Sequence, residues 1–224
     1  MHVKEVHGHK NGQKYIEENH AAELEDVVAA ISQVSAVAVL TKRSDEKTKP
    51  DLLFSPEALN DSIKTFLHPR GWTEPAPNSK KGFREPRIYL ANGREFREMD
   101  GIKNKVGLEI QFGKYAFMGY DIFSKMPIFG KQGLIVCGIE VVVTQAMIPN
   151  MSTGVSSFSQ IVMDMRARGE ADLDLPTLVI GIECNKGEWG AVQKKRDRYR
   201  RDPKAMIESG EVSAGRQGAK PGPK

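Results

Sequence analysis

The stretch NKVGLEIQFGKYAF, residues 104–117, contains the strand around which the rest of the chain can be arranged. Its even-numbered positions from 106 to 112 are apolar, and they alternate with Gly107, Glu109 and Gln111. A period of two is typical of a β-strand with one buried face. Glu109 and Gln111 therefore share the opposite face, and Asp100 lies nine residues upstream of Glu109.

Two helices are predicted before this strand. The apolar residues of 20–34 fall on one helical stripe, with Asn19 available as the N-cap. A second helix is predicted after Ser55, with Pro56 in its first turn and apolar residues at 59, 63 and 66. Between 87 and 112 the pattern predicts three strands of a meander.

The region after residue 112 predicts two further helices and two buried strands. A short helix is expected at 115–129. A second helix is expected where the apolar residues between 155 and 165 recur at helical spacing. The near-continuous apolar runs 134–144 and 175–183 are typical of central strands covered on both faces. This order of elements indicates a mixed β-sheet flanked by helices, in the α/β or α+β class.

Charge is distributed unevenly along the 224 residues. Residues 185–224 contain eleven Lys or Arg against five Asp or Glu, whereas 1–184 contain 22 against 24. We predict one folded domain over 1–184, followed by a basic tail, 185–224, that is partly helical and partly disordered. The overall basic balance belongs to this tail, so a nucleic-acid surface on the domain would have to be local.

Cysteine use and hydropathy suggest the compartment. No run of about 18 apolar residues is present, so no membrane span or membrane partner is expected. The N-terminal residues lack the apolar core of a signal peptide. Cys137 and Cys184 each lie in an apolar run, which favours buried, reduced thiols in a cytoplasmic protein.

Asp100, Glu109 and Gln111 are the candidate site. Two carboxylates on adjacent strands can point into one pocket, where a hard cation such as Mg²⁺ takes oxygen ligands. Such a cation polarises a phosphate and activates water for attack on phosphorus. The spacing alone does not decide this, because an Asp at a strand end commonly forms a turn and a Glu on a strand commonly faces solvent.

The run IQFGKY after Glu109 resembles the catalytic strand of the BglII/BstYI family of type II restriction endonucleases. The likeness is greatest to the BstYI branch, and it extends in the same order through NGQKYIEENH, TKRSDEKTK, FSPEALND, the GWTE turn, MSTGVSSF and LVIGIE. It covers residues 2 to 184, with an interruption at 75–98. The resemblance implies an α/β fold of the PD-(D/E)xK nuclease type and a bacterial restriction enzyme. Two positions depart from that signature: Met99 stands where Pro is usual, and Gln111 stands where Lys is usual, the latter a feature of this branch.

Carried over by position, the resemblance implies that Asp100 and Glu109 bind Mg²⁺ together with the carbonyl of Ile110. Gln111 would orient a water, since a neutral amide cannot act as a general base at pH 7. Glu74 would be an additional polar contact to the metal or its waters. No isolated catalytic lysine and no Cys/His zinc site is predicted.

The resemblance also implies a homodimer on palindromic double-stranded DNA with a GATC core, cut to leave four-base 5′ overhangs, and a DNA methyltransferase in the host. Two segments are candidates for reading bases: Lys114, and the residues Ser152, Thr153, Ser156 and Ser157. Solvent exposure or a phosphate contact is an equally good interpretation of Lys114, and N-capping is a better one for any single serine. Lys42 and Arg43 belong to a basic loop suited to phosphate contacts.

Two alternatives remain at this point. One is a less specific repair or recombination nuclease of the same fold. The other is a DNA-binding protein without catalysis, which the carboxylate pair disfavours, because two negative charges beside a phosphate weaken binding unless a cation lies between them.

Overall fold

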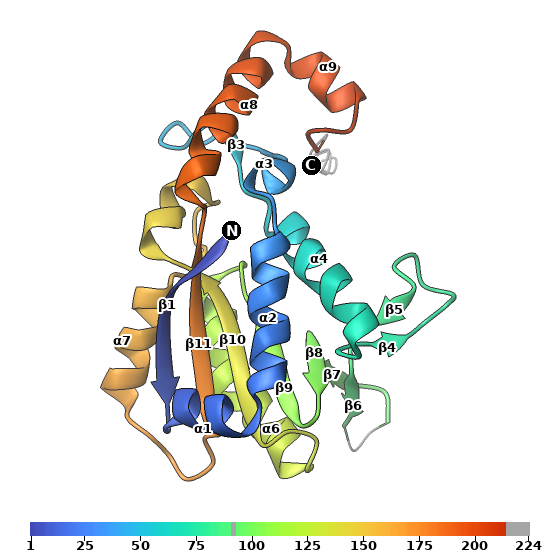
Figure 1. Ribbon diagram of the computed structural model, residues 1–224, viewed down its shortest axis with the longest axis vertical. Coiled ribbons are helices and arrows are strands. Elements are labelled where there is room, and N and C mark those ends of the chain that lie inside the picture. The colour runs from blue at the N-terminus through green and yellow to red at the C-terminus, as the bar shows by residue number, and fades with distance from the viewer. Residues whose placement is uncertain (91–92, 214–224) are drawn as a thin grey trace, which may run out of the picture.

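A five-stranded mixed sheet forms the centre of the protein (Figure 1), which is described as a computed structural model over residues 1–90 and 93–213. The strand order is β1-β11-β10-β9-β8. The bounds are β1 His2–His9, β8 Gly101–Lys103, β9 Val106–Ile110, β10 Cys137–Val143 and β11 Thr177–Glu183. β9, β10 and β11 are parallel to one another, whereas β1 and β8 run antiparallel at the two edges. The predicted mixed sheet is therefore confirmed.

Helices cover both faces of this sheet. Their bounds are α1 Gly12–Asn19, α2 Ala21–Gln33, α3 Ala36–Val39, α4 Pro56–Leu67, α5 Tyr115–Tyr120, α6 Met126–Lys131 and α7 Phe158–Arg168. α2 and α4 pack in the main core with Val106, Leu108 and Ile110 of β9. α5 and α7 pack in a second core with Val142 of β10 and Val179 of β11. Glu109 faces the side opposite the main core, as the alternation predicted.

Local sequence accounts for several of these boundaries. The Ser55 hydroxyl accepts a hydrogen bond from Ala58 N (3.2 Å), so α4 begins with the predicted cap. Asn104 and Lys105 have φ of 46° and 65°, which suits the tight turn between β8 and β9. The predicted helix at 115–129 is divided, because a π-helix, Asp121–Lys125, joins α5 to α6.

The predicted meander is wrong in part. β6 (Arg87–Tyr89) and β7 (Phe96–Glu98) pair with each other in a separate two-stranded sheet, while only β8 and β9 join the main sheet. An ion pair of 2.6 Å between Arg87 and Glu98 supports the small sheet. Two more small sheets pair β2 (Lys42–Arg43) with β3 (Leu52–Leu53), and β4 (Glu74–Pro75) with β5 (Phe83–Arg84). Three 3₁₀ turns lie at His68–Arg70, Gln145–Asn150 and Lys186–Glu188.

The core continues beyond residue 184. α8 (Trp189–Arg201) rises from the end of β11 and is followed by α9 (Pro203–Glu208) (Figure 1). Val192, Tyr199 and Met206 belong to the main apolar core. The buried Arg196 donates to the carbonyl of Leu52 (3.1 Å). The first part of the predicted tail is thus helical and packed; residues 214–224, which the prediction of disorder includes, lie outside the described residues.

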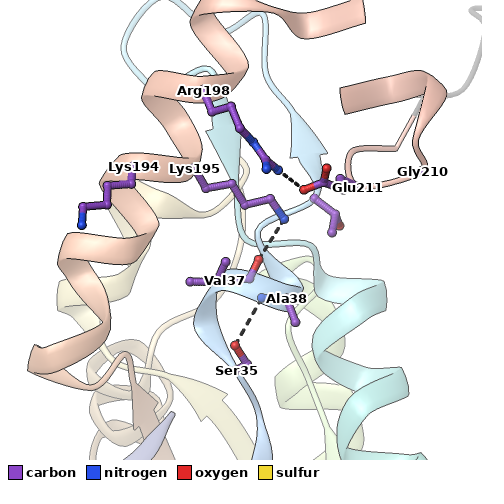
Figure 2. Close-up of a pocket in the computed structure, with 9 residues that line it drawn as sticks. Ser35, Val37, Ala38, Lys194, Lys195, Arg198, Gly210 and Glu211 are labelled. Atoms are coloured by element: carbon purple, nitrogen blue, oxygen red, sulfur yellow. Dashed lines mark hydrogen bonds and ion pairs between the residues drawn. The ribbon is translucent and has the colours of Figure 1, made fainter. Parts of the chain in front are cut away.

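A pocket lies between α3, α8 and the segment after α9 (Figure 2). There Lys195 donates to the carbonyl of Val37 (2.9 Å) and Arg198 pairs with Glu211. The pocket is separate from the candidate site on β9. Within the described residues, no helix is long and apolar enough to cross a membrane.

Candidate active site

Asp100 lies in the bend before β8, beside the end of β9. Its Oδ2 accepts a hydrogen bond from the backbone N–H of Ile110 (2.8 Å). Met99 is fully buried, and it packs where Gly107 has no side chain, since a Cβ there would lie 2.7 Å from Met99 Sδ. Methionine in place of the signature proline is therefore a core residue, and it helps to fix Asp100 next to β9.

Glu109 projects from β9 toward the π-helix, and its side chain is buried. Lys125 Nζ lies 2.8 Å from Glu109 Oε1, as an ion pair rather than an aligned hydrogen bond, and 2.6 Å from Asp121 Oδ1. Glu140, the partner of Glu109 in register on β10, is 0% exposed, and neither of its carboxyl oxygens has a hydrogen-bond partner. The structure thus gathers three buried carboxyl groups around one ammonium.

This arrangement raises the pKa values of the buried glutamates. Burial raises the pKa of Glu109 well above its usual value, and the charge of Asp100 adds to the effect although Lys125 opposes it. Burial likewise raises the pKa of Glu140, with contributions from Asp121 and Glu109. When all three are ionised, the cluster carries more negative charge than Lys125 neutralises, which favours either protonation or an added cation.

A second lysine approaches the site from the other direction. Lys64 of α4 places its Nζ 2.6 Å from Asp100 Oδ1 and 2.9 Å from Glu85 Oε1. Burial alone would lower the pKa of Lys64, but Asp100 and Glu85 outweigh it and raise that pKa. The ammonium therefore stays charged and orients the Asp100 carboxylate.

Glu74 does not join this group in the structure. Its carboxylate pairs with Arg84 across β4 and β5 at 2.6 Å, on an exposed part of the small sheet. Glu85 directly follows Arg84 in the sequence. Its carboxylate is the one that Lys64 connects to Asp100. In the structure Glu74 therefore pairs with Arg84, whereas Lys64 links Asp100 to Glu85. The role of Glu74 near the metal stays a prediction.

Gln111 lies immediately after β9 and is partly buried. Its backbone N–H donates to the carbonyl of Val141 (2.9 Å), which holds the residue at the carboxyl end of the parallel strands. Its Oε1 makes only a long contact of 3.4 Å with the Gly113 N–H. The side-chain amide is therefore available to bind water or a phosphate at this end of the sheet.

The lysines near the site, Lys64 and Lys125, were missed by sequence reasoning, which expected no isolated catalytic lysine. Lys64 follows Ile63 on a helix with both polar and apolar residues, and Lys125 follows Asp121 by one helical turn; each pattern is common on a surface helix. A stronger signal was Glu140, a single carboxyl group in the apolar run LIVCGIEVVVT. Such a residue in a central strand indicates a buried charge that needs a partner.

The oxygen donors fit a hard divalent cation that retains water ligands. Among residues 1–90 and 93–213, no three Asp, Glu, His or Cys side chains converge closely enough to hold a metal by themselves. Mg²⁺ is commonly bound by one or two carboxylates, with waters and substrate phosphates completing the shell. Asp100, Glu109 and the carbonyl of Ile110 would hold it here.

Comparison with known proteins decides the family. The sequence matches the family described as restriction endonuclease BglII/BglIII over residues 4–182. The chain belongs to this family. It is therefore a type II restriction endonuclease, a site-specific nuclease, as the sequence predicted.

The BglII/BglIII family assignment agrees with the fold. The chain is similar to the crystal structure of restriction endonuclease BglII complexed with a DNA 16-mer, with a TM-score of 0.62 and 18% identity over 83% of this chain and 80% of that chain. At this identity the likeness shows a shared fold alone. None of the curated proteins compared with the sequence matches it. The closer likeness to BstYI stays a prediction.

In this BglII/BglIII family member, Lys114 and the loop at 151–154 lie together. Lys114 is exposed at the start of α5 and forms a backbone bridge with Val155. Ser152 accepts a hydrogen bond from Lys42 Nζ (2.6 Å), and the Thr153 hydroxyl donates to Glu46. Residues predicted from three separate segments are thus assembled on one part of the surface.

Two of the predicted DNA contacts are buried, and a third is bound to another helix. Ser156 and Ser157 are 0% exposed, and the Ser157 N–H is bound by the Gln160 side chain (2.9 Å) at the start of α7. Ser157 caps the start of α7, and neither serine presents its hydroxyl on the surface. Arg43 donates to the Tyr199 hydroxyl (3.1 Å), so it links its loop to α8.

Proposed function

We propose that the enzyme is a Mg²⁺-dependent homodimer that cuts a palindromic GATC-centred hexamer, RGATCY or AGATCT, and leaves four-base 5′ overhangs. The observation that carries the catalytic part is the 2.8 Å hydrogen bond from Ile110 N–H to Asp100 Oδ2. It brings a carboxylate from the bend before β8 to the end of β9, which contains Glu109 and is followed directly by Gln111. A host DNA methyltransferase would protect the same sequence.

Catalysis would divide between the carboxylates and the amide. Mg²⁺ held at Asp100, Glu109 and the Ile110 carbonyl would polarise the scissile phosphate and acidify a bound water. Gln111 would orient the attacking water through its side-chain amide, without removing its proton. Lys64 would keep Asp100 in place from the α4 side through its 2.6 Å contact.

Sequence reading would come from the surface around Lys114. A lysine in the major groove can donate to O6 and N7 of guanine, which suits the fixed G of the core. The hydroxyls of Ser152 and Thr153 can donate or accept, which suits an outer position where either purine is tolerated. Lys42, already bound to Ser152, would contact a phosphate. Two-fold symmetry of the homodimer would repeat these contacts on the other half-site.

The proposal is tested by digesting an unmethylated plasmid of known sequence with Mg²⁺, and then sequencing the cut ends. Discrete fragments ending at GATC-centred hexamers with four-base 5′ overhangs are expected. A smear would indicate the less specific nuclease. DNA that is bound but not cut with Mg²⁺ or Mn²⁺ would indicate the non-catalytic DNA-binding protein. A digest containing a chelator controls for contaminating activity.

The basic α8 supports a prediction about salt. Removing 185–224 would expose the main core, because Val192 and Tyr199 belong to it, so deletion cannot separate charge from folding. The exposed Lys194 and Arg201 can instead be changed together to Gln. If α8 contacts phosphates, the slope of log affinity against log salt should fall by about two, with the cleaved sequence unchanged. Fluorescence anisotropy at several salt concentrations measures the slope; a changed cleavage site would contradict a sequence-independent role.

A further inference from the structure

Lys125 occupies an unusual backbone position. It is the last residue of the π-helix Asp121–Lys125, a rare element that often occurs at functional sites. Its side chain is 14% exposed, and its ammonium lies between Glu109 (2.8 Å) and Asp121 (2.6 Å), both nearly buried. The π-helix therefore delivers a buried cation directly to one of the proposed metal ligands.

An ion pair between Lys125 and Asp121 does not account for all the carboxyl groups near this lysine. Asp121 alone would neutralise this ammonium. Glu140 adds a third carboxyl group whose two oxygens have no hydrogen-bond partner, although it is fully buried. Buried polar groups without partners are costly, so they persist where function requires them or where a further ligand satisfies them. The excess of carboxyl groups is concentrated at Glu109, beside the strand end where Gln111 replaces the signature lysine.

We propose that Lys125 is a positioning residue for cleavage, which anchors the Glu109 carboxylate from the π-helix and so holds it ready to bind Mg²⁺. This inference rests on the proposed role of Glu109 as a metal ligand. The contacts of Lys125 are with Glu109 and Asp121, so it acts through Glu109 and not on the phosphate. Asp121 holds the ammonium through its 2.6 Å contact, so the ammonium keeps its place beside Glu109.

Lys64 provides a useful contrast. It contacts Asp100 and Glu85, and neither of these carboxylates is more than four-fifths buried. Solvent can replace part of its effect, whereas the nearly complete burial of Glu109 leaves Lys125 as the group that fixes its orientation. Loss of a residue that orients a metal ligand typically costs about 10–100-fold in metal affinity or activity.

The test compares Lys125→Met and Lys125→Arg with Lys131→Met, a matched control that removes an exposed lysine from α6. Binding of Mn²⁺ to the full-length protein is followed by electron paramagnetic resonance of the free ion, and cleavage is measured in single-turnover reactions. We expect Lys125→Met to bind Mn²⁺ about 10–100-fold more weakly and to cleave correspondingly more slowly, and Lys125→Arg to recover most of both losses. Lys131→Met should behave as the wild type.

Two further variants make the result decisive. Glu109→Gln should lose Mn²⁺ binding and cleavage; if it keeps both, the proposed function of this site is wrong. If Glu109→Gln is inactive while Lys125→Met matches Lys131→Met, only the inference about Lys125 is wrong. Lys125→Met combined with Asp121→Asn keeps the pair electrically balanced and replaces the single variant if that one does not fold. Recovery of wild-type Mn²⁺ affinity in this double variant would show that Lys125 serves only Asp121, and would overturn the inference.

Discussion

Replacing Asp100 with Ala should reduce DNA cleavage by about 10³-fold or more, while specific DNA binding stays unchanged or becomes tighter. Loss of a metal ligand removes several kcal/mol of transition-state stabilisation, and each 1.36 kcal/mol corresponds to a factor of ten in rate. Binding is spared because the variant removes a negative charge from beside the scissile phosphate. Single-turnover cleavage and anisotropy with a cognate duplex measure the two effects.

The structure supplies a control for this variant. Asp172 is exposed on the loop before β11, and Asp172→Ala should leave both quantities unchanged. Asp100→Asn separates the two roles of the side chain, because an amide oxygen can still accept from Ile110 N–H. Normal cleavage by Asp100→Ala would show that Asp100 is not a metal ligand.

Replacing Glu109 with Gln should abolish cleavage and, at the same time, make the protein more stable. Burial raises the pKa of Glu109 in the folded protein, so the folded state gives up this proton less readily than the unfolded state does. Stability contributed by this group therefore falls as the pH rises above its usual value of 4.5. Gln carries no charge, so the stability gained by the substitution should be larger at pH 8 than at pH 4.

Chemical denaturation at these two pH values measures the gain, with Glu25→Gln on the exposed side of α2 as the control. Glu140→Gln should stabilise the protein with the same dependence on pH, because burial raises that pKa too. A Glu109→Gln protein that is less stable than the wild type at pH 8 would show that the ion pair with Lys125 outweighs the burial of the charge.

Local patterns predicted most of the fold. The alternation at 106–112 identified β9 and the face that carries Glu109, and Ser55 marked the start of α4. β1 was missed because HVKEVHGH has no apolar alternation; it lies at the edge of the sheet, where one side of the strand has no neighbour. β6 and β7 look like strands of the main sheet in sequence, and only their mutual pairing separates them from it.

The candidate site was predicted less completely, for a physical reason. Asp100, Glu109 and Gln111 are close in sequence, and one β-turn and one backbone hydrogen bond bring them together. Lys64, Glu85 and Lys125 reach the same carboxylates from a helix, a loop and a π-helix. Their positions depend on how distant segments pack. The local spacing of apolar residues carries no information about that packing. Ser157 caps α7, the interpretation that the sequence favoured for any single serine, because a capping pattern and a binding loop have similar compositions.

The packing of Met99 against Gly107 has a consequence for finding related enzymes in genome sequences. A search pattern built on a proline before the aspartate would overlook this chain. The contact couples two positions on either side of a turn, because a larger residue at 107 would displace the methionine that precedes Asp100. A query of the form M-D-x6-G-x-E-x-Q requires the methionine and the glycine together. It would recover nucleases in which a methionine before the aspartate packs against a glycine on the next strand.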